Sequence, residues 1–303
     1  MDFLSFLADL RNPVGDFFFL LTTNLGHEVF FMIVALAVLW CGKRHHGYYI
    51  LVSGFLGIIC NQVLKLLCRV PRPWVLDPKF EAVEAAKPAA TGYSFPSGHT
   101  QSATTLYGGV ARAYKHTALR IACIAAVVIV SFSRMYLGVH TPADVLTSLA
   151  IGTVIVFLLY PLFERVGKNM RLMYPIALAL CALAFGYVLF VELFPFPADM
   201  DPLHYADGAK NAYSLLGAAV AILPVLYLDE HYIRYDSHAS MLWQFVKVAV
   251  GLLLLLGIKE GCKMPLDLIF GDLAVKHAVR YFLMVLVGGA LYPYFFRFIP
   301  KKK

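Results

Sequence analysis

The chain has 303 residues, of which 60% are hydrophobic and only 15% are charged. So few polar residues cannot cover a water-soluble globule of this size, which favours a protein that crosses the membrane several times. The formal net charge of +7 comes from basic residues in short stretches between apolar runs, so it reports membrane topology and gives no reason to expect nucleic acid binding.

The first apolar stretch, Phe3 to Leu21, is interrupted by Asp9, Pro13 and Asp16. It therefore falls short of the ~20 apolar residues that a membrane helix needs. We predict an N-terminal interfacial helix within residues 1–26. Because no basic cluster precedes these apolar positions, we expect no cleaved signal peptide, and the first span is expected to act as the signal anchor.

Nine apolar runs follow, and each is expected to form a membrane helix. The first six make a predicted core over residues 27–195, and the last three make a C-terminal transmembrane extension over 196–303. The runs are 27–41, 48–68, 97–114, 118–136, 142–163, 172–194, 212–228, 241–258 and 273–298. The predicted fold is all-α: a polytopic membrane helical bundle with a six-helix core plus about three further helices.

Alternation of the spans places one set of basic loops on a single side of the membrane. By the positive-inside rule this side is cytoplasmic, and the C-terminus lies there too. The remaining loops then face the extracytoplasmic or lumenal side. The basic residues are Lys43, Arg44, Arg112, Lys115, Arg120, Arg165, Lys168, Arg171, Arg297, Lys301, Lys302 and Lys303.

Three separate stretches with ionisable residues fall at span ends on that opposite side, where such residues indicate a functional site. In the first, Lys65 is followed after six residues by Arg72-Pro73. The second reads Pro96-Ser97-Gly98-His99, and the third runs from Ser133-Arg134 through His140 to Asp144.

These residue types suit phosphoryl transfer, which needs positive charge on the phosphate oxygens, a nucleophile and an acid for the leaving group. Lys65, Arg72 and Arg134 supply three cations. Ser97 is placed to cap the third span, so that the amides of the next residues point at an anion. Gly98 would let a phosphate approach the backbone closely.

The two histidines can divide the remaining chemistry. Thr141-Pro142-Ala143-Asp144 has the form of a capped helix start, which puts His140 about one turn from the Asp144 carboxylate. If Asp144 accepts a proton from one imidazole nitrogen, the other nitrogen is left as a nucleophile. His99 could then protonate the departing alkoxide.

Each residue also has a purely structural interpretation. Lys65 and Arg72 could reach lipid headgroups from a helix end, Asp144 alone is more often a cap, and a single histidine at a membrane surface is more often structural. His27, at the external end of the first span, is explained by a helix start. The joint pattern favours catalysis, because so many suitable groups at span ends on one face are hard to collect by chance.

The three stretches resemble the signature of the type 2 phosphatidic acid phosphatase family of integral membrane lipid phosphatases, and every signature position matches. The resemblance implies a metal-independent phosphomonoesterase with no cofactor. It also implies a phosphohistidine on His140, with His99 as proton donor. Phosphate would be bound by Lys65, Arg72, Ser97, Gly98 and Arg134.

The amino-acid sequence around His140 and the extra spans are most similar to the sphingosine-1-phosphate phosphatase branch. Glucose-6-phosphatase is similar in its nine expected spans. Gly98 departs from the sphingosine branch, where threonine is expected. Glycine is commoner in general lipid phosphatases and undecaprenyl pyrophosphatases. The substrate therefore stays open among these lipids.

The resulting hypothesis is a membrane enzyme that hydrolyses a lipid phosphate monoester, phosphatidate or a sphingoid-base phosphate, which enters sideways from the bilayer. The alternatives are an undecaprenyl pyrophosphate phosphatase or a lipid phosphotransferase. A phospholipid transporter or scramblase is the non-enzymatic alternative, although no internal repeat supports it. The last three spans carry no residues that decide their role, and nothing in the sequence decides the oligomeric state.

Overall fold

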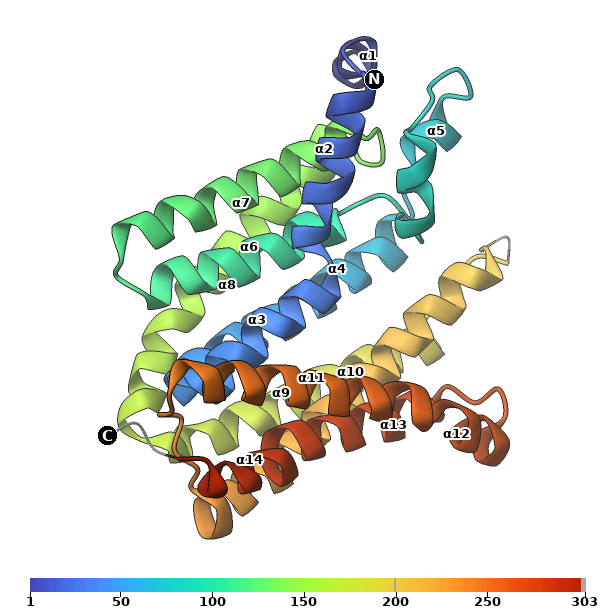
Figure 1. Cartoon of the computed structure of the whole chain (residues 1–303). Helices are drawn as coiled ribbons and strands as arrows, with labels where there is room; N and C mark the ends of the chain where they lie inside the picture. Colours follow the sequence, from blue (N-terminus) through green and yellow to red (C-terminus); the bar gives the residue numbers. More distant parts are fainter. Residues whose placement is uncertain (199, 301–303) are drawn as a thin grey trace. The chain divides into compact units, whose positions relative to one another are not determined.

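Helices dominate residues 1–198 and 200–300, the part of the chain that the computed structural model describes (Figure 1). These residues contain no β-strand, which confirms the all-α, polytopic class. The tail residues Lys301, Lys302 and Lys303, used above for topology, lie outside the described residues.

Seven helical stretches in the described part are long and apolar enough to cross a membrane. They are Arg44–Leu76, Thr117–Tyr136, Pro142–Lys168, Met170–Leu193, Pro202–Ile233, Met241–Phe270 and Val275–Phe298. An eighth is obtained if Pro13–Gly26 and Glu28–Cys41, which are bent by 48°, are counted as one broken span. The stretch predicted to span at 97–114 is helical, but it is not among these seven.

The chain divides into two compact units, of which the first comprises Met1–Ala35 and Tyr48–Phe163. It holds α1 (Asp2–Asp9), α2 (Pro13–Thr23), α5 (Pro73–Leu76), α6 (Gly98–Ala113), α7 (Thr117–Tyr136), and most of α4 (Arg44–Cys68) and α8 (Pro142–Lys168). Helix α3 (Glu28–Cys41) begins in this unit. Helices α6 and α7 lie side by side (Figure 1), and His116 caps the start of α7 in the turn that joins them.

The second unit comprises Leu36–Gly47 and Glu164–Lys303. Its helices are α9 (Met173–Leu193), α10 (Pro202–Leu228), α11 (Met241–Gly261), α12 (Lys263–Phe270), α13 (Val275–Leu286) and α14 (Tyr292–Tyr294). Helix α10 packs so closely on α13 that a Cβ on Gly217 would lie 1.9 Å from the Ala278 carbonyl oxygen. The predicted boundaries after residues 26 and 195 stay a prediction.

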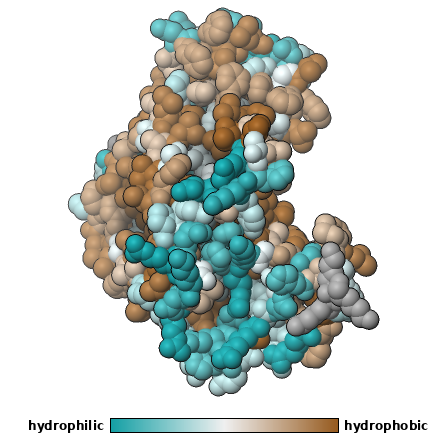
Figure 2. Space-filling model, turned by 90° about the vertical axis from the view of Figure 1, so that its left-hand side faces the viewer, coloured by the Kyte–Doolittle hydropathy of each residue, from teal (hydrophilic) through white to brown (hydrophobic). Residues whose placement is uncertain are grey.

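Large hydrophobic side chains stand on the surface, as expected for helices that face lipid (Figure 2). Leu158 of α8 is 72% exposed and Ile121 of α7 is 63% exposed. Polar and charged side chains of the first unit are buried instead, including Ser97, Arg134 and Asp144. This reversal of the pattern of a water-soluble protein supports a membrane location for the helices, with a polar centre between them.

Candidate active site

The turn between α7 and α8 fixes the position of His140. The amides of Val139 and His140 both donate to the Arg134 carbonyl oxygen, at 3.1 and 3.2 Å. Gly138 has a φ of +74°, and a Cβ there would lie 2.6 Å from Arg11 Nη2, so only glycine suits this turn.

Helix α8 then begins with the predicted capping arrangement. The Thr141 amide donates to Asp144 Oδ2 at 2.8 Å, and the Asp144 amide donates to Thr141 Oγ1 at 3.3 Å. These reciprocal bonds satisfy two donors at the helix start, with Pro142 in the first helical position. The expected cap is confirmed, and it holds the Asp144 carboxylate one turn from His140.

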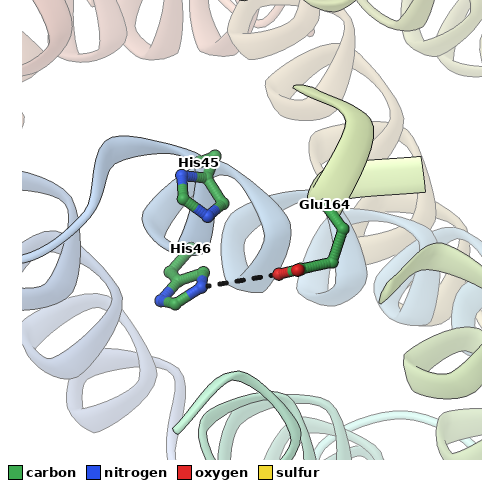
Figure 3. A group of neighbouring side chains, drawn as sticks. All are labelled: His45, His46 and Glu164. Carbon is green, nitrogen blue, oxygen red and sulfur yellow. Dashed lines mark ion pairs between the residues drawn. The ribbon is translucent and has the colours of Figure 1, made fainter. Parts of the chain in front are cut away.

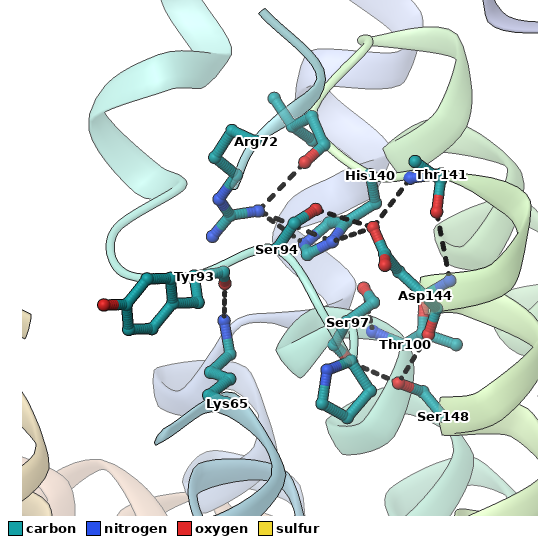
Figure 4. A network of polar contacts seen from close by, with 12 residues as sticks. Lys65, Arg72, Tyr93, Ser94, Ser97, Thr100, His140, Thr141, Asp144 and Ser148 are labelled. Atoms are coloured by element: carbon teal, nitrogen blue, oxygen red, sulfur yellow. Dashed lines mark hydrogen bonds and ion pairs between the residues drawn. The ribbon is translucent and has the colours of Figure 1, made fainter. Parts of the chain in front are cut away.

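Asp144 orients the imidazole of His140 (Figure 4). His140 Nδ1 lies 3.3 Å from Asp144 Oδ2, which also accepts from Ser94 Oγ at 2.6 Å. Arg72 Nη1 lies close to both ring nitrogens, 2.9 Å from His140 Nε2 and 3.4 Å from Nδ1. An ionised carboxylate can only accept, so we assign the proton of the neutral imidazole to Nδ1, beside Asp144, and the lone pair to Nε2.

The surroundings of His140 keep its ring neutral. The side chain is 2% exposed, and the charges of Arg72, Arg134 and Lys65 all act on it. Burial, reinforced by these three cations, lowers the pKa of His140 well below its ordinary value of 6.5. A neutral imidazole with a free lone pair is the form that can attack phosphorus.

Backbone carbonyls of the loop before α6 and of the turn between α7 and α8 hold the first two cations. Arg72 donates to the carbonyl oxygens of Thr91 at 2.7 Å, Gly92 at 3.0 Å and Val139 at 2.9 Å. Lys65 Nζ, in the last turn of α4, donates to the Tyr93 carbonyl oxygen. Both cations therefore lie beside His140, although they come from a different segment.

The second motif joins α6 to α8. Ser97 caps α6 by accepting from the Thr100 amide at 3.5 Å, a long bond in the predicted position. The Ser97 amide donates to the Asp144 carbonyl oxygen at 3.1 Å, and Ser148 Oγ donates to the Ser97 carbonyl oxygen at 2.9 Å. A Cβ on Gly98 would meet Asn61 Oδ1 at 3.8 Å, an ordinary contact distance, so packing alone does not require glycine there.

Arg134 lies fully buried at 0% exposure. Its Nη1 donates to Thr23 Oγ1 at 2.7 Å, whereas Nε and Nη2 have no hydrogen-bond partner within the described residues. A buried guanidinium with two unused donors is costly unless a ligand completes it. An anion such as a phosphoryl group has the required acceptors and charge.

The N-terminal segment lies beside the candidate site, although the sequence favoured a helix start as the explanation of His27. The ring of His27 lies 6.0 Å from that of His99, centre to centre. A Cβ on Gly26 would lie 2.8 Å from the His99 carbonyl oxygen, so this corner packs directly on the start of α6. The charges of Arg134, His140 and His27 all act on His99. The structure therefore brings the second histidine into the same charged surroundings as the first.

The sequence analysis also missed three polar residues that contact the predicted site residues or their motifs. Asn61 donates to the Pro96 carbonyl oxygen at 3.2 Å. The sequence could have indicated this residue, because it lies one helical turn before Lys65 and therefore on the same face of the helix. Ser94 lies just before Pro-Ser-Gly-His and could have been noticed as a small polar neighbour. Thr23 carries no motif, and only the folded chain reveals its contact with Arg134.

Comparison with known families gives two matches along the chain. Residues 45–168 match the model of the PAP2 superfamily, and this stretch contains all eight predicted site residues. Residues 213–303 match the model described as "PAP2 superfamily phosphatase, transmembrane extension".

Individual relatives carry phosphatase names. Undecaprenyl-diphosphatase BcrC of Bacillus subtilis (strain 168) is 30% identical over 135 residues, 44% of this chain and 67% of that protein. A probable sphingosine-1-phosphate phosphatase of Dictyostelium discoideum is 30% identical over 159 residues, 48% of this chain and 38% of that protein. Sphingosine-1-phosphate phosphatase 1 of Rattus norvegicus is 25% identical over 224 residues, 71% of this chain and 49% of that protein.

The matched stretch thus spans about two thirds of the bacterial relative and half or less of the two sphingosine-phosphate phosphatases. No solved structure matches the chain at a comparable level of significance. The relatives' names support the expected class of enzyme, a phosphoric monoester hydrolase, in an integral multi-pass membrane protein. The chain belongs to the PAP2 superfamily of phosphatases, the family that its three motifs resemble.

Proposed function

We propose that this chain hydrolyses a lipid phosphate monoester without a metal ion, by way of a phosphohistidine on His140. The observation that carries this proposal is the state of the His140 imidazole. Asp144 orients it through Nδ1, and the cation Arg72 lies 2.9 Å from its Nε2 and 3.4 Å from its Nδ1. An oriented nucleophile among positive charges is what phosphoryl transfer requires of a protein that supplies no metal.

In the first step, His140 Nε2 attacks phosphorus, the N–P bond forms, and the bond from phosphorus to the ester oxygen breaks. The negative charge of the bound phosphate favours the protonated form of His99, which gives a proton to the departing alkoxide. Asp144 stabilises the His140 ring as it becomes positively charged. The lipid leaves as an alcohol.

In the second step, His99 takes a proton from a water molecule, whose oxygen attacks phosphorus. The N–P bond breaks, inorganic phosphate is released and His140 returns to its neutral form. His99 is protonated again and ready for the next substrate.

The cations have different parts in this scheme. Arg134 offers Nε and Nη2, which have no hydrogen-bond partner within the described residues, to two phosphate oxygens. Arg72 Nη1 lies 2.9 Å from His140 Nε2, so its guanidinium is placed to bind the oxygens of a phosphoryl group at that nitrogen. Lys65, Ser97 and Gly98 complete the phosphate cradle by charge, by capping α6 and by leaving room.

We propose a sphingoid-base phosphate or phosphatidate as substrate. The rat sphingosine-1-phosphate phosphatase matches 71% of this chain, whereas the bacterial undecaprenyl-diphosphatase matches 44%. The glycine at position 98 is not required by packing, because a Cβ there would meet Asn61 Oδ1 only at 3.8 Å, so it does not weigh against the sphingosine branch. The lipid chain would stay in the bilayer while its headgroup reaches His140.

The orientation in the membrane is part of the proposal. The basic loops described above support a cytoplasmic C-terminus, with the site on the extracytoplasmic or lumenal face. A substrate with a charged headgroup and an apolar chain could then enter sideways between helices, as in the hypothesis drawn from the sequence.

A substrate panel tests the proposal most directly. Purified protein would be assayed for phosphate release in excess chelator with phosphatidate, sphingosine-1-phosphate, undecaprenyl phosphate and undecaprenyl diphosphate. We expect turnover of a monoester in chelator and an acid-labile, radiolabelled phosphoenzyme that His140→Gln lacks. Wild-type-like turnover by His140→Gln, or a strict need for divalent metal, would refute the mechanism.

The second candidate is the undecaprenyl-diphosphate phosphatase, favoured by the name of the bacterial relative. Preferential release of phosphate from the diphosphate would select it. Transfer of the labelled phosphoryl group to an added lipid or sugar alcohol would instead select a phosphotransferase.

A further inference from the structure

Two helix ends bring together three side chains that are suited to bind a metal ion and that the phosphatase mechanism does not use. His45 and His46 lie in the first turn of α4, and Glu164 lies near the end of α8. One ligand atom from each of the three lies within 4.8 Å of the other two (Figure 3). Two imidazole nitrogens and a carboxylate oxygen form a donor set that Zn²⁺ binds in proteins.

The distance between His46 and Glu164 is close to that between two ligands of one ion. His46 Nε2 lies 3.9 Å from Glu164 Oε1, beyond a direct hydrogen bond. Two ligands that each lie ~2.0–2.2 Å from a tetrahedral zinc ion are ~3.4 Å apart. The pair is therefore ~0.5 Å wider than a shared tetrahedral ion requires, a difference that a small movement of the exposed Glu164 side chain closes.

His45 is held by close packing on α8. Its ring centre lies 4.3 Å from that of His46, and a Cβ on Gly167 would lie 3.0 Å from three atoms of the His45 ring. Gly167 comes one helical turn after Glu164. A glycine at this position thus lets the imidazole lie against the helix that supplies the carboxylate.

We propose that His45, His46 and Glu164 form a binding site for a divalent transition-metal ion, with Zn²⁺ as the first candidate. Three protein ligands leave a coordination position for water, and the Glu164 side chain is 48% exposed, so the ion would exchange with solvent. The positive charge of Lys43 acts on both imidazoles and weakens the affinity. The site would link the start of α4 to the end of α8 reversibly.

Zinc titration tests the proposal on the purified full-length protein. After treatment with chelator and its removal, zinc chloride would be added in competition with a chromophoric chelator. We expect one saturable site per chain in the micromolar range. Loss of a partner that only supports a ligand costs ~10–100-fold in affinity, so His46→Gln and Glu164→Gln should each weaken binding by at least ~10-fold.

His231→Gln is the matched control, because His231 is an exposed histidine of the second unit that contacts the Tyr227 carbonyl oxygen instead. It should bind zinc as the wild type does. Absence of a saturable site in the wild type, or equal binding by wild type, His46→Gln and Glu164→Gln, would overturn the proposal.

A second measurement covers the case in which His46→Gln fails to fold. Zinc should raise the Tm of the wild type and of His231→Gln but leave that of Glu164→Gln unchanged, and Glu164, being half exposed, is replaced with little risk to packing. Phosphate release in chelator reports folding of each variant independently of zinc. An equal rise of Tm in Glu164→Gln would contradict the site, whereas loss of phosphate release by the wild type would contradict only the proposed phosphatase.

Discussion

At the scale of single residues, the Asp144 carboxylate decides which nitrogen of His140 attacks. Its Oδ2 accepts from Ser94 Oγ and the Thr141 amide and faces His140 Nδ1. In Asp144→Asn the amide cannot accept these bonds with the same charge, so the wrong tautomer of His140 becomes populated. We expect kcat to fall by ~10²–10⁴-fold, with KM little changed.

Ser94→Ala is the control for this experiment, because it removes one of the bonds to Asp144 and keeps the carboxylate. It should lose far less activity than Asp144→Asn. Equal losses in the two variants would show that the charge of Asp144 does not matter for the reaction.

Arg134 gives a second prediction at this scale. Its guanidinium is fully buried: Nη1 donates to Thr23 Oγ1, and Nε and Nη2 are left as donors for a phosphate. Arg134→Lys keeps the charge but loses the paired donors. We expect kcat/KM to fall ~10–100-fold, which corresponds to ~1.4–2.8 kcal/mol of lost binding to the transition state. Arg120→Lys, at the other end of α7, should leave kcat/KM near the wild-type value.

The lowered pKa of His140 predicts the acid side of the pH profile. Since burial and three cations keep this ring neutral below pH 6.5, kcat/KM should persist as pH falls through 6.5 and decline only at lower pH. In Arg72→Gln one cation is gone, so the acid limb should move to higher pH while overall activity falls. The same substrate is used for both proteins, so the titration of the substrate phosphate affects both pH profiles equally. An unmoved limb would mean that another group titrates.

The sequence predicted the chemistry of these residues better than their partners. Lys65, Arg72, His140 and Asp144 could be identified because charged groups at the ends of apolar runs have few structural reasons to be there. The carbonyl oxygens that bind Arg72 could not be identified in this way, because every residue has a carbonyl oxygen. Only the folded chain brings those of residues 91, 92 and 139 to the guanidinium.

At the scale of elements, the corner between α2 and α3 positions the start of α6. A Cβ on Gly26 would lie 2.7 Å from Val130 Cγ1 and 2.8 Å from the His99 carbonyl oxygen. Gly26→Ala must therefore shift either the corner or His99, and such overpacking costs ~1–3 kcal/mol. We expect a lower Tm in detergent and a reduced kcat.

Gly186→Ala is the matched control, since a Cβ at this exposed position of α9 meets no described atom within 4 Å. Alanine also favours a helix over glycine by up to ~1 kcal/mol, so Tm should stay or rise. Wild-type activity in Gly26→Ala would show that the N-terminal corner does not set the position of His99.

The apolar runs predicted most helices, but α6 is less apolar than a membrane span was expected to be. Its 16 residues include Ser102, Thr104 and Thr105, and the two threonines donate to carbonyl oxygens one turn back. Polar side chains of this kind lower the mean hydropathy of a helix, although the helix packs against other helices of the first unit. Composition therefore could not tell a polar membrane helix from a shorter interior one.

At the scale of the whole molecule, the proposed orientation predicts which loops a membrane-impermeant reagent can reach. Lys79, in the loop after α5, and Lys115, between α6 and α7, are both exposed, and the positive-inside rule assigns them to opposite sides. In a chain whose own six cysteines are replaced, Lys79→Cys should react with an impermeant maleimide in intact cells, and Lys115→Cys only after permeabilisation. If the protein resides in an internal membrane, sealed vesicles with the lumen inside should show the opposite order. Equal reaction of both cysteines in sealed membranes would contradict a span between them, and with it the placement of His99 and His140 on one face.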